Sequence, residues 1–321
     1  MGNRTAVSTF LLWGFSSFPE LQHLLFVVIF LSHITILLAN ASIMVTIRLN
    51  RSLHKPMYFF LFGLSLSETC TTMVIIPRML VDLLSASKTI SLPECATQML
   101  FFFGLGANNC FILSAMSYDR YTAIRNPLHY PILMTQKVCF QLMGASCVLG
   151  FLISLCIVII VFNLSFCNSN IIQHFFCDIA PVVSLACNYT ILQQMALLTF
   201  TAFVLVGSFS LIMISYVFIV ATVVKMPSAE GRYKTFSTCS SHFTVVFIHY
   251  GFACFVYLRT KNSDSFGEDT LMAVTYTVLT PLLNPIIYSL RNKDMQTALR
   301  KDLGNVIRLF PQIVDKRTQK N

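Results

Sequence analysis

The sequence contains few charged residues for its length. Only 11% of its 321 residues are Asp, Glu, Lys or Arg, where a typical soluble protein carries about 25%, and tryptophan occurs once, at Trp13. So little charge cannot coat a soluble globule of this size. It also excludes a disordered chain, a coiled coil and a nucleic-acid binder, despite a net charge of +9. Apolar residues make up 55% of the chain and the mean hydropathy is +0.71, which indicates a polytopic membrane protein.

Seven stretches of the chain are long and apolar enough to cross a bilayer as helices. Roughly 20 apolar residues suffice for one crossing, and continuous rather than alternating apolar runs favour helices over a barrel. One stretch carries Glu68 near its centre and Arg78 near its end. We therefore predict an all-α bundle of seven transmembrane helices at Leu24–Ile47, 56–80, Ala96–Tyr118, Val138–Val161, Ala196–Val224, Ser237–Leu258 and Thr270–Leu290.

The positions of lysine and arginine predict how these helices are oriented. Seven crossings place the two ends of the chain on opposite sides, and 17 of the 22 Lys and Arg lie on the side of the C-terminus. Because basic residues accumulate in cytoplasmic loops, we expect a cytoplasmic C-terminus and an N-terminus on the outside of the membrane. Topology and attraction to anionic membrane lipid then explain the basic excess, with no nucleic-acid partner. An outside N-terminus would also expose the glycosylation acceptor Asn3 in Asn3-Arg4-Thr5.

The predicted spans divide the chain into three parts. Residues 1–23 form the extracellular N-terminus, residues 24–290 the seven-helix domain, and residues 291–321 a cytoplasmic segment. In that last segment Met295, Ala298, Leu299 and Leu303 recur at helical spacing beside basic residues. This pattern predicts a short amphipathic eighth helix on the inner leaflet, followed by a tail.

Four of the eleven cysteines fall on the predicted extracellular side, where disulfides persist. Cys95 lies at the start of the third helix, and the other three lie in the long loop after the fourth. A bond from Cys95 to one of them would hold this loop over the bundle, and the remaining two could close a hairpin within it. The residues alone leave the partner open among Cys167, Cys177 and Cys187.

Polar side chains occur at mid-membrane depth in four of the helices. Glu68 is a carboxylate there, which costs at least about 2.5 kcal/mol unless it is paired, hydrated or protonated. Asn40, Asn109 and Asn284 lie at comparable depth. These residues predict either a hydrated pocket in which Glu68, Asn109 and Asn284 hold a sodium ion, or a set of hydrogen bonds that fixes helix packing. The two interpretations are compatible.

Small and aromatic residues share one face of the third helix and one face of the sixth in their outer halves. No acid or base lies on these faces, so a ligand there would be small, mostly apolar and held by shape with a few hydroxyl contacts. For each residue alone, packing between helices is the alternative. The predicted ligand-binding residues are Phe102, Phe103, Gly106, Ala107, Cys110, Phe200, Val204, Tyr250, Ala253, Cys254, Tyr257 and Thr277.

Two motifs near the cytoplasmic ends of helices predict a conformational switch. Asp119-Arg120-Tyr121 closes the third helix with an adjacent acid and base, which alone could be an interfacial ion pair worth little. In Asn284-Pro285-Ile286-Ile287-Tyr288 the proline frees a backbone carbonyl and kinks the helix, and Pro281 adds a second break one turn earlier. Two prolines can be packing kinks, but with polar residues on the weakened segment we favour a hinge.

Together, these residues resemble the rhodopsin-like G-protein-coupled receptors, and within them the olfactory (odorant) receptors. The likeness covers roughly Phe10 to Lys301 and rests on motifs that occur in order along the chain. The seven motifs are Leu53–Leu61, Ser117–Ile124, Asn126–Tyr130, His174–Asp178, Ser215–Tyr216, Lys234–His242 and Pro281–Asn292.

The resemblance implies a receptor, not an enzyme, that needs no cofactor beyond the candidate sodium ion. It would bind small volatile odorants in the outer half of the bundle and activate a stimulatory, olfactory-type G protein that raises cAMP. The resemblance also implies pairing of Cys95 with Cys177 and of Cys167 with Cys187. The implied coupling and switch residues are Asp119, Arg120, Tyr121, Tyr216, Asn284, Pro285 and Tyr288.

Several positions depart from the family pattern. His249 replaces the usual aromatic residue before Tyr250-Gly251, Arg125 stands where Cys is common, and Cys147 takes the place of a Trp in the fourth helix. Arg125 adds charge at the face expected to meet the G protein. Loss of the Trp would weaken packing of the fourth helix, although the predicted fold does not depend on it.

Other functions fit the sequence less well. A rhodopsin-like receptor for a non-odorant small molecule outside the nose is the main alternative. A receptor for a peptide or charged amine would require an acid in the outer pocket and Trp-x-Pro in the sixth helix. A channel or transporter would require internal repeats or lines of ionisable residues, and an intramembrane enzyme would require paired Asp or His-Glu-x-x-His. A retinal protein needs a Schiff-base lysine in the seventh helix, and Thr270–Leu290 contains none.

Overall fold

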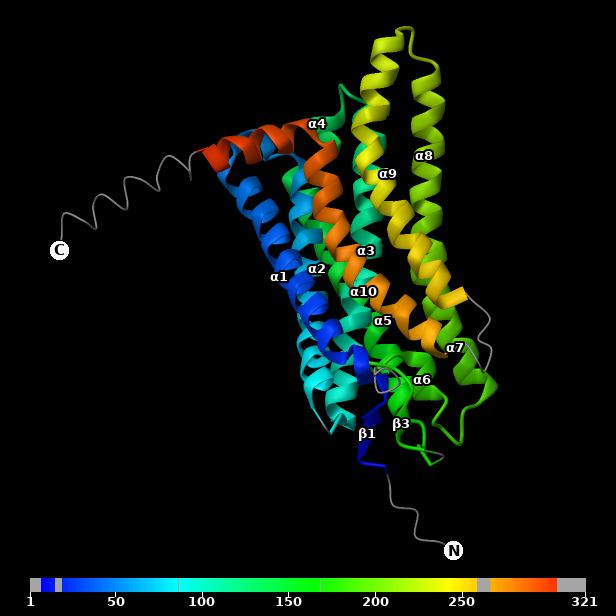
Figure 1. Cartoon of the computed structure of the whole chain (residues 1–321). Helices are drawn as coiled ribbons and strands as arrows, with labels where there is room; N and C mark the ends of the chain where they lie inside the picture. The colour runs from blue at the N-terminus through cyan, green and yellow to red at the C-terminus, as the bar shows by residue number, and fades with distance from the viewer. Residues whose placement is uncertain (1–6, 15–18, 86, 168, 259–265, 305–321) are drawn as a thin grey trace, which may run out of the picture.

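The computed structural model describes residues 7–14, 19–85, 87–167, 169–258 and 266–304, apart from the side chains at 234, 237–238, 255–272 and 290–291. Within this part of the chain, long helical segments run side by side as a bundle (Figure 1). They are α1 (Gln22–Leu49), α2 (Pro56–Leu84), α3 (Leu92–Arg125), α5 (Gln136–Phe162), α7 (Ile191–Ala202) continued through the π-helical turn η4 (Phe203–Gly207) into α8 (Ser208–Val224), α9 (Ala229–Leu258) and α10 (Phe266–Arg291).

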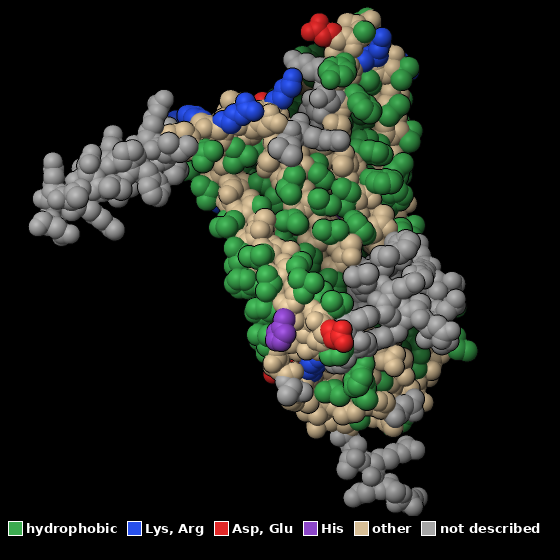
Figure 2. All heavy atoms as spheres, viewed as in Figure 1, with side chains coloured by type: hydrophobic (Ala, Val, Ile, Leu, Met, Phe, Trp, Pro, Cys, Tyr) green, Lys and Arg blue, Asp and Glu red, His purple; other side chains and the backbone are tan. Residues whose placement is uncertain are grey.

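The bundle has an apolar exterior and polar groups inside, which is the reverse of a soluble protein. Leu31 and Leu38 of α1 are 59% and 64% exposed, whereas Asn40 on the same helix is fully buried. Figure 2 shows hydrophobic side chains covering the middle of the molecule. Among the described residues, five helical segments are long and apolar enough to cross a membrane: α1, α2, α3, α5 and α7–η4–α8. In α9, the buried polar residues His242 and His249 lower the hydropathy of the helix.

Glycine allows α3 and α5 to pack closely. A Cβ atom built on Gly150 of α5 would lie 2.8 Å from the carbonyl oxygen of Gly104 on α3, and one on Gly104 would lie 2.8 Å from the Phe151 ring. Ser154 Oγ donates a 2.7 Å hydrogen bond to the Leu100 carbonyl across the same interface. Small residues at a crossing let two backbones approach closely, as is usual within membranes. Cys147 is exposed on α5, so the missing Trp leaves no gap in this interface.

A three-stranded sheet lies at one end of the bundle, which we call the disulfide end. Strand β1 (Thr9–Leu12) pairs antiparallel with β2 (Thr89–Ser91) and parallel with β3 (Ile171–Ile172). The chain then turns at Gly14, whose φ of +37° favours glycine and which packs on Phe175. Phe10 and Leu12 are buried beneath the sheet.

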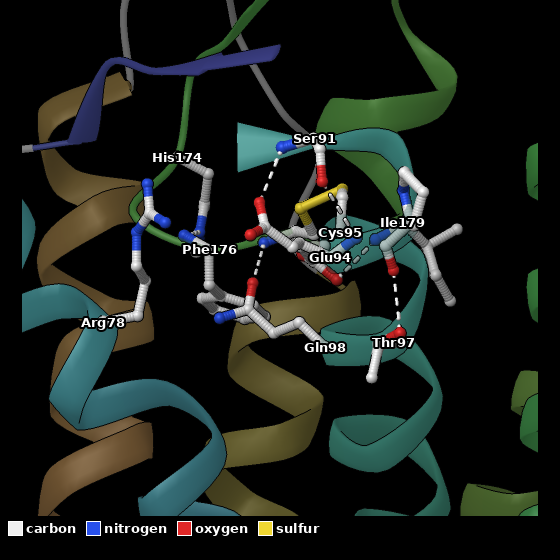
Figure 3. Close-up of a disulfide and its surroundings, with 12 residues drawn as sticks. Arg78, Ser91, Glu94, Cys95, Thr97, Gln98, His174, Phe176 and Ile179 are labelled. Atoms are coloured by element: carbon white, nitrogen blue, oxygen red, sulfur yellow. Dashed lines mark hydrogen bonds between the residues drawn. A yellow bond between two sulfur atoms is a disulfide. The ribbon is translucent and has the colours of Figure 1, made fainter. Parts of the chain in front are cut away.

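Two disulfides fix the loop between α5 and α7 at this end. Cys95 bonds to Cys177, with a Cα–Cα distance of 5.5 Å, and Cys167 bonds to Cys187, with a Cα–Cα distance of 5.9 Å. These are the two pairs that the resemblance implies. Figure 3 shows the first bond beside Gln98, whose Oε1 accepts a 3.0 Å hydrogen bond from the Cys177 backbone N–H.

The final helix, residues 293–304, crosses the opposite end of the bundle, which we call the basic end. It is bent by 89° from α10 and lies across α1 and α2 (Figure 1). Hydrogen bonds from Asn50 to Asp302 (2.8 Å) and from Tyr58 to Asn292 (3.0 Å) hold it there. A helix is therefore found where the sequence predicted an amphipathic one. Of the apolar residues predicted on this helix, Met295 and Ala298 are buried against the bundle, whereas Leu303 is 62% exposed.

Candidate functional site

A cavity of about 530 Å³ lies among α3, α5, α7, η4, α9 and α10, toward the disulfide end. The loop carrying His174 and Asp178, and the short helix α6 (Ile179–Val183), also line it. Its size is typical of small-molecule sites. Eight of the twelve predicted ligand-binding residues line this cavity: Phe102, Phe103, Gly106, Ala107, Cys110, Val204, Ala253 and Thr277.

The face predicted on the third helix is the one that faces the cavity. Phe102 packs against Phe103 and Phe176, with ring centroids 5.2 and 4.8 Å apart, and so joins α3 to the disulfide-linked loop. One turn further on, a Cβ atom at Gly106 would meet no atom within 4 Å. The absence of a side chain there leaves open space in the cavity wall.

Two of the residues predicted on the sixth helix, Tyr250 and Cys254, do not line the cavity. The Tyr250 hydroxyl forms a 2.6 Å hydrogen bond with Ser208 Oγ instead of lining the cavity, and Cys254 is exposed. Helix α9 instead presents His249 and Ala253, one helical turn apart. Phe200 of α7 is half-buried against the core and does not line the cavity either. The Tyr257 side chain lies outside the described residues.

The cavity is more polar than the sequence suggested. Glu68, His174, Asp178 and His249 all line it, although we predicted no acid or base on its helix faces. Among the described lining residues there is no Lys or Arg. For His249, the sequence offered one signal: it differs from the aromatic residue that is usual at this position in the family. No sequence pattern pointed to the other missed lining residues, which include Tyr189, Gln194 and Tyr276.

The four polar residues at mid-membrane depth are all buried, and hydrogen bonds join Asn40, Glu68 and Asn284 to other helices. Glu68 of α2 accepts a hydrogen bond from Asn284 of α10. Asn40 of α1 donates to the Pro281 carbonyl at 3.4 Å. Because Pro285 has no N–H to bond this carbonyl, Asn40 occupies an acceptor that the proline leaves free. The packing interpretation of this cluster is therefore realised in the structure.

The same cluster also contains oxygen atoms that form no hydrogen bond with another described residue. Among the described residues, Asn109 Oδ1, Thr280 Oγ1 and Asn284 Oδ1 are buried without a hydrogen-bond partner. Glu68, Asn109 and Thr280 line the floor of the cavity. Oxygen atoms of carboxylate, amide and hydroxyl groups are the ligands that hard cations prefer. This set could hold such a cation or ordered water.

Asp119 is the centre of a polar network at the basic end. Its side chain is completely buried. Its Oδ2 accepts a 3.0 Å hydrogen bond from Arg120 Nε, and its Oδ1 accepts a 2.6 Å bond from the hydroxyl of Tyr130 in α4 (Tyr130–Leu133). Burial, together with the negative charge of Asp119, raises the pKa of Tyr130 above its usual value of 10. The phenol therefore stays protonated and continues to donate.

His242 of α9, a residue of the family motif to which we assigned no role from the sequence, links the predicted switch residue Tyr216 to the third helix. Its Nε2 donates to the Leu113 carbonyl at 3.1 Å, and its Nδ1 lies 2.8 Å from the Tyr216 hydroxyl. Tyr288 lies buried with no partner for its hydroxyl among the described residues, and Tyr121 packs on Phe218 with ring centroids 5.8 Å apart. Asn3 lies outside the described residues.

A profile of the olfactory receptor family matches residues 26–305, which is most of the chain. The chain belongs to the olfactory receptor family. Among its relatives, Olfactory receptor 10T2 of Homo sapiens is 51% identical over 300 residues, which cover 94% of this chain and 95% of the relative. Olfactory receptor 10R2 of Homo sapiens is 52% identical over 302 residues, which cover 94% and 90% of the two chains.

Membership in this family confirms the predicted fold and class of function. The chain is a multi-pass membrane protein of the seven-helix type, and a G-protein-coupled receptor for odorants rather than an enzyme. In this olfactory receptor the cavity lies toward the disulfide end, and the Asp119–Arg120 pair lies toward the basic end. Helices α3 and α9 run from one region to the other (Figure 1).

Proposed function

We propose that this olfactory receptor binds small, mostly apolar volatile molecules in the 530 Å³ cavity and activates a stimulatory, olfactory-type G protein at the basic end, which raises cAMP. The cavity is the single observation that carries the proposal. It is large enough for a small ligand, and aromatic and aliphatic side chains dominate its wall on α3, α5 and α7.

The proposal places the receptor in the plasma membrane with its N-terminus outside. Residues 1–23 are then extracellular, residues 24–290 span the membrane, and residues 291–321 are cytoplasmic. The two disulfides lie at the end assigned to the oxidising side, where Asn3 would accept a glycan. Lys and Arg side chains gather along the final helix at the other end (Figure 2), where they would meet anionic lipid.

Activation is a shift between two populated conformations. Ligand in the cavity favours the conformation in which the basic end of α9 moves away from α3 and opens a cleft. Arg120 then leaves Asp119 and contacts the G protein, next to Tyr121. Tyr216 and Tyr288 move toward the opened cleft, and the segment around Asn284 and Pro285 acts as the hinge.

A sodium ion at the floor of the cavity would bias this equilibrium. Glu68, Asn109 and Asn284 would hold it, with Thr280 as an additional oxygen ligand. Asn109, Asn284 and Thr280 each have a buried side-chain oxygen atom without a hydrogen-bond partner among the described residues, which supports this assignment. When bound, the ion supplies positive charge that offsets the buried carboxylate.

A cAMP screen tests the proposed function. Cells that coexpress the receptor and an olfactory-type stimulatory G protein are exposed to a broad panel of volatile compounds, and surface receptor is measured in intact cells through an N-terminal epitope. We expect at least one volatile to raise cAMP, and Arg120→Ala to abolish the response at equal surface level. Silence across the panel with verified surface receptor would favour a non-odorant ligand outside the nose. An epitope that is accessible only after permeabilisation would contradict the orientation.

A further inference from the structure

A polar contact joins α3 and α9 at the cavity. His249 Nε2 lies 3.4 Å from Cys110 Sγ, and both side chains line the cavity while being only 4% and 2% exposed. A thiol is a weak hydrogen-bond partner. A ligand group that bonds more strongly can therefore replace Cys110 as the partner of His249.

Acceptor atoms without partners are found in the same part of the cavity. Asn109 precedes Cys110 on α3, and Thr280 lies on α10; both line the cavity. Asn109 Oδ1 and Thr280 Oγ1 are buried with no partner among the described residues. A buried acceptor without a hydrogen bond is unfavourable, so a ligand that brings a donor gains affinity whenever the proposed sodium ion does not occupy these oxygen atoms.

These groups distinguish among ligand classes. A hydroxyl group can bond the imidazole and also donate to an acceptor such as Asn109 Oδ1. A carbonyl group has no donor for Asn109, and a hydrocarbon bonds neither residue. A carboxylate would meet the acids Glu68 and Asp178, with no Lys or Arg among the described lining residues to balance its charge.

Building on the proposed function, we propose that this receptor prefers alcohols and that His249 is the residue that determines this preference. The ligand hydroxyl takes the place of the Cys110 thiol at His249. The hydrocarbon part lies against the apolar wall formed by Phe102, Phe103 and Val204. Because the Cys110–His249 contact links two helices, its replacement also changes how α9 is held against α3. His242, two helical turns earlier on α9, forms a further link to α3.

Matched ligands and variants test this proposal. The probes are straight-chain alcohols of six to ten carbons, with the aldehyde and the alkane of each length, and the readout is the EC50 for cAMP at matched surface expression. We expect the wild-type receptor to respond to an alcohol at about tenfold lower concentration than to its aldehyde or alkane, as one additional hydrogen bond allows. His249→Phe, which restores an aromatic residue, should remove this preference, and His249→Gln should retain part of it.

Cys110→Ala tests the same proposal without changing His249. Removing the competing thiol should lower the EC50 of an alcohol by about threefold relative to that of the alkane of equal length, a change smaller than the energy of one full hydrogen bond. Equal shifts for both classes, or no shift for alcohols, would overturn the proposal, as would an alcohol preference that survives in His249→Phe. A wild-type receptor that responds to volatiles without preferring alcohols disproves the inference alone. A wild-type receptor at the surface that responds to no volatile disproves the proposed function as well.

Discussion

His242 Nδ1 lies 2.8 Å from the hydroxyl oxygen of Tyr216, and this contact ties α9 to α8 below the cavity. Because His242 Nε2 donates to the Leu113 carbonyl of α3, Nδ1 is the acceptor of the neutral ring and Tyr216 is its donor. One imidazole thus joins three helices near Asp119 and Arg120. Movement of α9 away from α3 must break the bond to Leu113.

Replacing His242 with Phe should raise basal activity. The variant loses the hydrogen bond to the Leu113 carbonyl, which exists only while α9 is held against α3 and is worth about 0.5–1.5 kcal/mol. We therefore expect ligand-independent cAMP to rise by about threefold to tenfold at equal surface expression. Thr244→Ala, on the same helix, removes a bond within α9 to the Ser240 carbonyl and should leave basal cAMP unchanged. Equal or lower basal activity in His242→Phe would contradict the claim that His242 holds α9 against α3.

Replacing Tyr130 with Phe should also raise basal activity, because Asp119 loses one of its two partners and holds Arg120 less firmly. The raised pKa of Tyr130 also leads us to expect that the effect of this variant does not change with pH. A phenol with a raised pKa keeps its proton up to that pKa, so its bond to Asp119 persists across neutral and mildly alkaline pH. The ratio of basal cAMP in Tyr130→Phe to that in wild type should therefore be the same at pH 7 and pH 9. A ratio that falls toward one at pH 9 would show that Tyr130 ionises in this range.

Adding a methyl group at Gly150 should destabilise the receptor. The Cβ atom of Gly150→Ala would lie 2.8 Å from the Gly104 carbonyl and 2.9 Å from the Asn108 backbone nitrogen, so α5 must move away from α3. Overpacking of this kind costs about 1–3 kcal/mol, which should appear as a lower melting temperature of the detergent-solubilised receptor. Gly144→Ala is the matched control on α5, because its Cβ atom meets nothing within 4 Å. Equal melting temperatures for the two variants would contradict the close crossing.

Replacing Cys95 with Ser should reduce the amount of folded receptor at the cell surface. The Cys95–Cys177 bond connects residues 82 positions apart, and loss of a native disulfide costs about 2–5 kcal/mol. The cavity should also lose its covering loop, so any residual receptor should respond more weakly to ligand. Cys147→Ser is the control, because Cys147 is a free, exposed cysteine of α5. Surface levels that match the control would show that the loop holds its position without the disulfide.

Hydropathy, charge and motifs were sufficient to predict the seven helices. Long apolar runs with one permitted conformation in lipid leave little choice of secondary structure. The residues predicted on one face of the third helix also line one cavity, because a straight helix keeps residues four apart on one side. The sequence did not reveal strand β1, whose partners lie far away in the chain.

The sixth helix shows the limit of reasoning from sequence. Tyr250, which we predicted to face the cavity, bonds Ser208 beside the π-helical turn, and His249 lines the cavity together with the predicted Ala253. A π-helical turn changes which residues of neighbouring helices meet, and single-helix periodicity does not contain that information. The polar floor was predicted as a cluster, but its connection to the cavity depends on how α2, α3 and α10 are packed.

The most direct test of ligand binding in the cavity is a concentration–response curve for the variant Gly106→Leu. Gly106 lines the cavity and has open space where a side chain would begin, so leucine should fill the ligand site without disturbing helix packing. Gly144→Leu adds the same side chain to the open, exposed surface of α5. We expect Gly106→Leu to raise the EC50 of an activating volatile by at least about tenfold, the effect of losing 1.4 kcal/mol of binding free energy, while Gly144→Leu matches wild type. An unchanged EC50 in Gly106→Leu at equal surface expression would show that odorants bind elsewhere.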